Sequence, residues 1–90
     1  MSSRTVRCRK YGTDLPGLDA PPMPGDLGQE LFETVSAKAW REWQHLQTML
    51  INEHHLALIE PEARKFLAEQ MRKFLDNEDY ERPSGYSPPD

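Results

Sequence analysis

The distribution of prolines most constrains how this chain can fold. Its 90 residues include eight prolines, most of which fall in two clusters, one before residue 25 and one after residue 82. Because proline lacks a backbone N–H and clashes with the preceding turn, it is poorly tolerated inside helices. The long middle of the chain is nearly free of such breakers, so the sequence predicts a helical middle between two non-helical ends.

Apolar residues in this middle segment recur at helical spacing, which indicates amphipathic helices. Ser36 suits the N-cap of a helix, where its side chain can accept a backbone N–H. Pro61 suits a first helical position, because a missing N–H is no loss there. The expected helices span residues 26–35, 37–52 and 61–77.

The apolar positions of these helices define the expected core. Leu27, Leu31 and Val35 lie at i, i+4 and i+8 and give the first helix one apolar face. Trp40 and Trp43 follow helical spacing in the second helix. We expect both indole rings to anchor the core, since aromatic side chains bury the largest areas.

Residues 4–11 have strand character instead. Alternation places Val6 and Cys8 on one face of the strand and Arg7 on the other, and a turn signal then leads into a short return strand. An isolated hairpin is marginal in water, so this one must pack on helices. We therefore predict an α+β fold, in which a short N-terminal antiparallel β-hairpin (residues 4–19) packs on a three-helix domain.

The length of the chain limits it to a small core. A chain of this size buries roughly 60–65% of the surface that its unfolded form exposes, so residues 1–90 are expected to form a single domain. Residues 78–90 contain three prolines and one glycine. We expect them to form a partly ordered tail.

The formal net charge of −4 argues against general nucleic-acid binding, which usually needs a basic surface. The charge is distributed unevenly along the chain. Four basic residues fall within the first ten positions, and four acidic residues follow the last apolar run. The basic residues are Arg4, Arg7, Arg9 and Lys10, and the acidic residues are Asp76, Glu78, Asp79 and Glu81.

The hydrophobic pattern predicts neither a membrane span nor a secretory signal. The longest apolar run, Met49–Ile51, is far below the ~18–20 residues that a spanning helix needs. The basic N-terminal residues are not followed by the apolar stretch of a signal peptide. A single cysteine also excludes an internal disulfide. We therefore expect a cytoplasmic protein without a membrane partner.

Several segments combine residues that are rare together. The longest is the run Ala39–Glu53, which contains W-x-x-W-Q-H-x-Q-T-M-L-I-N-E. Shorter ones are Arg4–Cys8, Pro24–Gly28 and Gly85–Pro88. With these segments the chain resembles, over nearly its whole length, the small bacterial Fe(II)-trafficking, or oxidative-damage-protection, proteins.

The resemblance implies an iron-handling accessory protein. Such a protein would bind Fe(II) weakly and exchangeably, support the synthesis or repair of iron–sulfur clusters, and protect against oxidative damage. Its partners would be iron–sulfur cluster assembly or repair proteins. We expect a monomer that is not an enzyme, because the sequence has no local catalytic motif and no phosphate-cradling glycine loop. The alternative is a metal-free redox or protein-interaction module acting through Cys8 or the helical face of residues 40–53.

Cys8 is the redox candidate, and it matches the N-terminal cysteine of the family. Arg7 and Arg9 adjoin it in sequence, and positive charge lowers the pKa of a thiol. The alternative is a small buried hydrophobe on the Val6 face of the strand. One cysteine cannot hold an iron–sulfur cluster, which requires about four thiolates.

Glu42 and His45 form the tentative metal site. They lie at i and i+3 on one helix, the spacing that di-iron bundles use, although such bundles need two copies and this chain has one. Imidazole and carboxylate are ligands that Fe(II) accepts. The alternative for His45 is an ordinary polar helix residue. His54 and His55 are expected either in a fraying last helical turn or in the solvated link to the next helix.

Three polar residues of the same helix form the tentative partner face. In one interpretation they satisfy hydrogen bonds beside the core aromatics, and in the other they contact a partner protein. A merely solvated face would tolerate almost any polar residue, which favours the second interpretation. The three residues are Gln44, Gln47 and Thr48.

Overall fold

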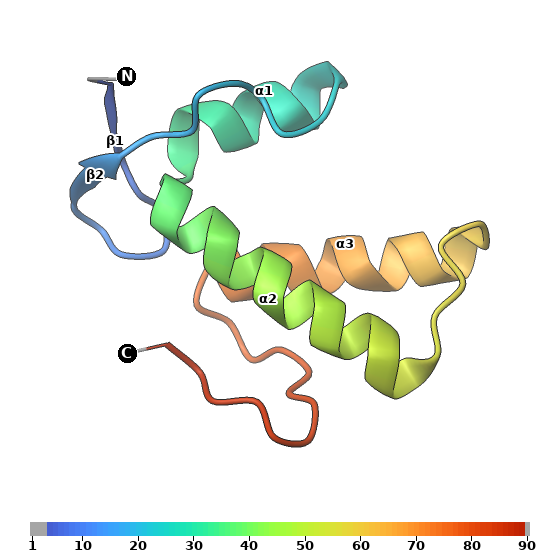
Figure 1. The fold of residues 1–90 in the computed structure, drawn as a ribbon. Helices are drawn as coiled ribbons and strands as arrows, with labels where there is room; N and C mark the ends of the chain where they lie inside the picture. The colour runs from blue at the N-terminus through green and yellow to red at the C-terminus, as the bar shows by residue number, and fades with distance from the viewer. Residues whose placement is uncertain (1–3, 90) are drawn as a thin grey trace. The chain divides into compact units, whose positions relative to one another are not determined.

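The computed structural model describes residues 4–89 as a short hairpin followed by three helices (Figure 1), which confirms the α+β class. These residues form two compact units, one ending at Arg41 and the other beginning at Glu42, and each has its own buried residues. That the whole chain folds as a single domain stays a prediction. The elements are β1 (Thr5–Arg7), β2 (Asp14–Pro16), α1 (Gly25–Thr34), α2 (Ala37–His54) and α3 (Pro61–Leu75).

In the first unit, β1 and β2 pair antiparallel with Val6 opposite Leu15 and Arg7 opposite Asp14. The predicted alternation is confirmed, because Val6 and Cys8 are buried whereas Arg7 is exposed. The opposed charges of Arg7 and Asp14 favour this register. The buried apolar residues of the unit are Val6, Cys8, Leu31, Val35 and Ala39.

Arg4 ties the hairpin to α1. Its guanidinium donates hydrogen bonds to the carbonyl oxygens of Leu18 and Phe32 and lies 3.7 Å from the centre of the Phe32 ring. Gly17 makes room for this arginine, since a Cβ atom at that position would overlap the guanidinium. The glycine also forms an antiparallel bridge with Ser36, so the hairpin contacts the segment that starts α2.

The core face of α1 differs from the expected one. Leu31 and Val35 are buried as predicted, but Leu27 is 43% exposed. Gly28, the next residue of the helix, is buried instead. The reason is a close approach of the backbone. The carbonyl group of Met23 lies where a Cβ atom of residue 28 would be, so only glycine fits.

The second unit is built around Trp43 and Phe74, whose ring centres lie 6.2 Å apart. Trp43 is 1% exposed and Phe74 is fully buried. The expectation that both tryptophans are core residues is half right, since Trp40 in the first unit is only partly buried. The other buried apolar residues here are Leu46, Leu50, Ala63, Leu67, Met71 and Leu75.

Two left-handed residues end the longer helices. His55 has φ +51° and follows α2, which runs two residues past its expected end. Asn77 has φ +59° and follows α3, which stops two residues before its expected end. In each case the next residue donates back into the helix, Leu56 to Ile51 (3.1 Å) and Glu78 to Lys73 (2.8 Å). These bonds satisfy carbonyls that a helix end leaves unpaired.

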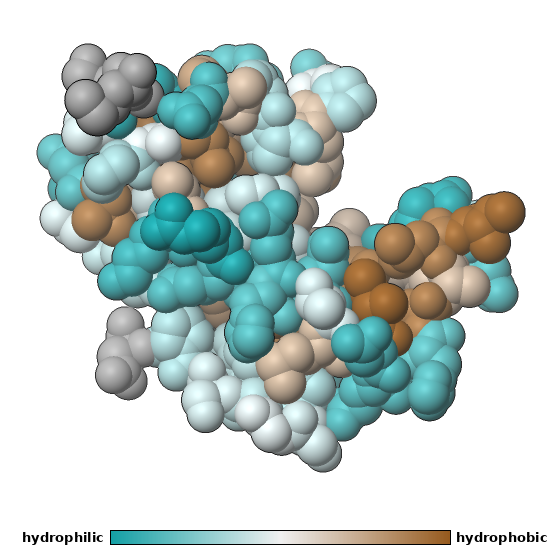
Figure 2. Space-filling view, viewed as in Figure 1, coloured by the Kyte–Doolittle hydropathy of each residue, from teal (hydrophilic) through white to brown (hydrophobic). Residues whose placement is uncertain are grey.

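The loop between α2 and α3 presents apolar side chains to solvent. Leu58 is 49% and Ile59 is 86% exposed, and Figure 2 shows hydrophobic surface near this loop. Arg64 holds the loop by donating to the carbonyl oxygens of both residues, at 2.9 and 3.0 Å. No helix within residues 4–89 is long and apolar enough to cross a membrane.

The segment after α3 has no regular secondary structure, but side chains of the helices hold it. The backbone N–H of Glu81 donates to Gln70 Oε1 at 2.7 Å, and that of Ser84 donates to Glu53 Oε1 at 2.9 Å. Tyr80 packs edge-on against Phe74, with ring centres 5.2 Å apart. The segment thus covers one end of the second unit's core.

Candidate functional site

Cys8 follows β1 and is fully buried in the first unit. Its N–H donates to the carbonyl oxygen of Thr13 at 2.9 Å, and the Gly12 N–H donates to the Cys8 carbonyl at 2.7 Å. Gly12 has φ +65°, a conformation that suits glycine in such a turn. The sulfur is therefore held by a closed turn and not by a mobile chain end.

Hydrogen bonds favour the thiolate form of Cys8. Burial raises the pKa of the thiol, but hydrogen bonds from the Ser36 side chain and from the backbone of Ser36, Tyr11 and Lys10 lower it. The net effect places the pKa below its ordinary value of 9.0. Ser36 Oγ also accepts the Ala39 N–H at 3.1 Å, as predicted for an N-cap, which leaves its hydroxyl proton for the sulfur.

The sequence explains only part of this thiol environment. Neighbouring basic side chains were one possible cause of a lowered thiol pKa, although strand alternation predicts that Arg7 points away from Cys8. The groups that lower the pKa are backbone N–H groups and one hydroxyl, and Arg7 is exposed on the opposite face of β1. Ser36 is the residue that sequence reasoning missed. Its N-cap position was visible, but its contact with a residue 28 positions earlier required the fold.

Tyr86 is the residue that links Glu42 and His45 in the second unit, since its ring lies near His45 and its pKa responds to the charge of Glu42. The ring centres of His45 and Tyr86 lie 6.5 Å apart. Glu42 is partly buried, and the negative charge of its carboxylate helps to raise the pKa of Tyr86. Their i and i+3 spacing on α2 places the carboxylate and the exposed imidazole on the same side of the helix.

Tyr86 is a neutral phenol at physiological pH. Burial contributes most to raising its pKa, followed by the hydrogen bond and charge of Tyr80 and the charge of Glu42. The two phenol oxygens lie 3.2 Å apart. Tyr86 can therefore donate or accept a hydrogen bond beside Glu42 and His45 without adding a charge. Its position far along the sequence explains why no spacing rule indicated it.

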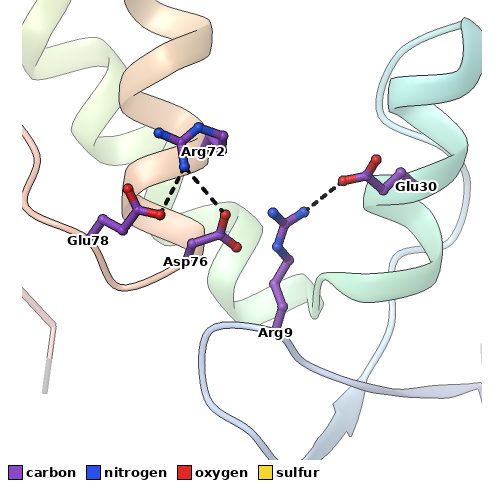
Figure 3. Close-up of polar contacts among 5 residues, drawn as sticks. All are labelled: Arg9, Glu30, Arg72, Asp76 and Glu78. Atoms are coloured by element: carbon purple, nitrogen blue, oxygen red, sulfur yellow. Dashed lines mark hydrogen bonds and ion pairs between the residues drawn. The ribbon is translucent and has the colours of Figure 1, made fainter.

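In the part of the chain that the structure describes, no three His, Cys, Asp or Glu side chains lie close enough together to hold a metal ion. Two of the acidic residues after α3 form ion pairs with a neighbouring arginine. Arg72 Nη1 lies 2.9 Å from Glu78 and 3.8 Å from Asp76 (Figure 3). His54 is the last residue of α2, which is the first of the two expected alternatives, and its ring centre lies 5.4 Å from that of Phe66.

The tentative partner face lies on the surface of α2. Gln44 and Thr48 are exposed and Gln47 is partly buried. The Thr48 hydroxyl donates to the Gln44 carbonyl oxygen at 3.1 Å, so it is engaged within its own helix. The two glutamine side chains lie one turn apart, and their contact with a partner protein stays a prediction.

The family model described as bacterial Fe(2+) trafficking matches residues 1–89. A probable Fe(2+)-trafficking protein from Alcanivorax borkumensis is 59% identical over 87 residues, which cover 97% of this chain and 93% of the relative. Proteins of the same description from Psychrobacter arcticus (60% over 86 residues, 96% and 90% covered) and Pseudomonas aeruginosa (58% over 87 residues, 97% of both) are also similar.

Proposed function

This chain belongs to the bacterial Fe(2+)-trafficking family, and from that premise we propose that it binds Fe(II) weakly and passes it to proteins that build or repair iron–sulfur clusters. Through this role it protects the cell from oxidative damage, and it acts in the cytoplasm as a non-catalytic monomer. The observation that carries the proposal is the match of the family model to residues 1–89, supported by relatives that are 56–60% identical.

Glu42 and His45 are the residues that we assign to Fe(II). One carboxylate and one imidazole are ligands that Fe(II) accepts, and their i and i+3 spacing puts them on one side of α2. With only two protein ligands, water fills most of the coordination sphere. A site of this kind releases its metal readily, as delivery to another protein requires.

An anaerobic Fe(II) titration followed by residue-resolved NMR tests this assignment. We expect paramagnetic broadening centred on Glu42, His45 and Tyr86. Glu42→Gln and His45→Gln should each weaken binding about tenfold, the equivalent of losing about 1.4 kcal/mol of ligand interaction. His55→Gln is the matched control, because it removes an exposed imidazole from the same unit and should leave the affinity unchanged.

Either of two results would contradict the assignment. Broadening centred on the acidic residues after α3 would show that Fe(II) binds at those residues instead. A protein that shows no site-specific broadening up to millimolar Fe(II) does not bind the ion directly, and iron trafficking would then have to proceed through a partner.

The environment of Cys8 favours a second candidate function, a metal-free redox module. Its hydrogen bonds stabilise the thiolate, which is the form that reacts with oxidants. Complete burial shields the sulfur, so an oxidant reaches it only when the turn of residues 8–13 opens. If Cys8 acts as a redox group, the Cys8→Ser variant should lose protection against oxidants and still bind Fe(II).

The pH dependence of stability tests whether Cys8 is a thiolate in the folded protein. Because its folded pKa is lowered, the folded state releases the proton at lower pH than the unfolded state does. The resulting stabilisation is complete above the unfolded pKa near 9.0 and disappears as the pH falls through the folded pKa. We expect the parent to gain stability relative to Cys8→Ser as the pH rises towards 9.0 in urea titrations. Parallel curves for the two proteins would show that folding does not lower the pKa of the thiol.

A further inference from the structure

The loop between α2 and α3 carries the most exposed large apolar side chain of residues 4–89. Ile59 is 86% exposed, and its neighbour Leu58 is 49% exposed. Figure 2 shows hydrophobic surface near this loop. Single exposed apolar residues are common on proteins, but here two large ones are adjacent in one loop. We call residues 56–60 the apolar loop.

Hydrogen bonds hold the apolar loop in one conformation. The Glu60 N–H donates to the Ala57 carbonyl oxygen at 3.0 Å, which closes a turn around Leu58 and Ile59. Arg64 Nη1 donates to the carbonyl oxygens of these two residues, at 2.9 and 3.0 Å. The loop therefore presents its apolar side chains in a fixed position. A surface that is already ordered loses less conformational entropy when it binds.

The apolar character of the loop does not serve the core of the second unit. The acceptors that hold the loop are backbone carbonyls, which any residue at positions 58 and 59 would supply. A side chain that stays 86% exposed, as Ile59 does, adds little buried apolar area to the stability of the fold. Burial of this side chain against another molecule would supply the missing stabilisation.

Carboxylates flank the apolar loop in the sequence. Residues 52–63 contain three glutamates and no lysine or arginine. Glu60 and Glu62 follow Ile59 closely and are both exposed. The next cation along the chain, Arg64, directs its guanidinium at the carbonyl oxygens of the loop itself. The loop thus combines protruding apolar side chains with exposed negative charge.

We propose that the apolar loop binds a basic amphipathic segment of a partner protein. Leu58 and Ile59 contact the apolar face of that segment, and Glu60 and Glu62 pair with its lysines or arginines. This inference goes beyond iron handling and does not depend on it. Two aliphatic side chains cover only part of the roughly 800 Å² per partner that a standard interface buries. We therefore expect a weak, reversible complex.

The charge of the loop distinguishes this partner from two others. A symmetric contact between two copies of the chain would bring the loop against itself, so that Glu60 and Glu62 face like charges. An anionic membrane surface would repel the same carboxylates. A basic amphipathic segment complements both the apolar and the acidic part of the loop.

Binding of a labelled helical peptide, with leucines on one face and lysines on the other, tests the proposal. We expect the peptide to shift the NMR signals of residues 56–62. Ile59→Ser should weaken binding about tenfold, because an aliphatic side chain is no longer buried. Glu60→Gln should weaken it about threefold, as expected for one exposed charge pair.

Two matched controls lie in the first unit. Leu27→Ser shortens an apolar side chain that is 43% exposed, and Glu33→Gln removes an exposed carboxylate. Neither should change the affinity for the peptide. Thermal unfolding followed by circular dichroism shows whether each variant is folded. Ile59→Ser should unfold at the same temperature as the parent, because the side chain contributes little to the core.

The remaining outcomes overturn the proposal. Equal binding of a peptide with the same composition in scrambled order, or equal weakening by the controls, reduces the interaction to unspecific attraction. Absence of peptide binding at low salt excludes a basic amphipathic partner. Self-association in sedimentation that Ile59→Ser abolishes assigns the loop to a second copy of the chain. Tighter binding to phosphatidylglycerol vesicles than to the peptide assigns it to a membrane.

Discussion

Replacing Trp43 with alanine is expected to lower the free energy of unfolding by about 4 kcal/mol. The indole ring is 1% exposed and packs against Phe74, so its removal leaves a large cavity in the second unit. A domain of this size has only about 5–10 kcal/mol of stability, which makes this loss a large part of the total. Urea denaturation followed by circular dichroism measures the change without relying on tryptophan fluorescence.

Trp40→Ala is the matched comparison for this prediction. It removes the same side chain from the same helix, but at a position that is only partly buried. Trp40→Ala should lower the free energy of unfolding clearly less than Trp43→Ala does. Should Trp43→Ala leave too little folded protein to measure, Trp43→Phe retains an aromatic ring and should lose less. Equal losses for Trp40→Ala and Trp43→Ala would show that the two indoles share the role that we give to Trp43.

Gly28→Ala is expected to lower the free energy of unfolding by about 3 kcal/mol, although it places alanine in a helix. Helix propensity alone predicts the opposite sign, a gain of about 1 kcal/mol. The new methyl group would overlap the carbonyl group of Met23, and a backbone contact cannot yield as a flexible side chain can. Urea denaturation of the variant and the parent decides between the two signs.

Gln29→Ala provides the control for this substitution. Gln29 is the next residue of α1 and is exposed, and its amide donates to Glu33 within the same helix at 2.9 Å. Its replacement should change the stability by less than about 0.5 kcal/mol. A Gly28→Ala protein as stable as the parent would mean that α1 and the segment before it can separate without cost.

Periodicity predicted the elements well because their patterns are local. Alternation of two residues placed Val6 and Cys8 inside, and the helical period placed Leu31 and Val35 inside. The prediction for Leu27 was wrong because burial there depends on the approach of Met23 to Gly28, which no local pattern contains. The helix ends were missed for a related reason, since left-handed conformations at a histidine and an asparagine are weak signals compared with glycine.

Less of the candidate site than of the fold could be predicted from the sequence. Cys8, Glu42 and His45 were identified from residue type and spacing, and their roles as thiolate and metal ligands remain proposals. Ser36 forms a hydrogen bond with Cys8, and the ring of Tyr86 lies near that of His45. Both Ser36 and Tyr86 are far away in the sequence from the residues that they contact. Their contribution depends on contacts between distant segments, which composition and spacing do not encode.

The segment after α3 also affects the order in which the molecule can form during synthesis. The first unit has its whole sequence once residue 41 has been made. The second unit must wait for Tyr80 to cover Phe74 and for Tyr86 to reach His45. N-terminal regions generally fold first on the ribosome. We therefore expect a nascent chain to bury Cys8 while the side of α2 that bears Glu42 and His45 is still open to water.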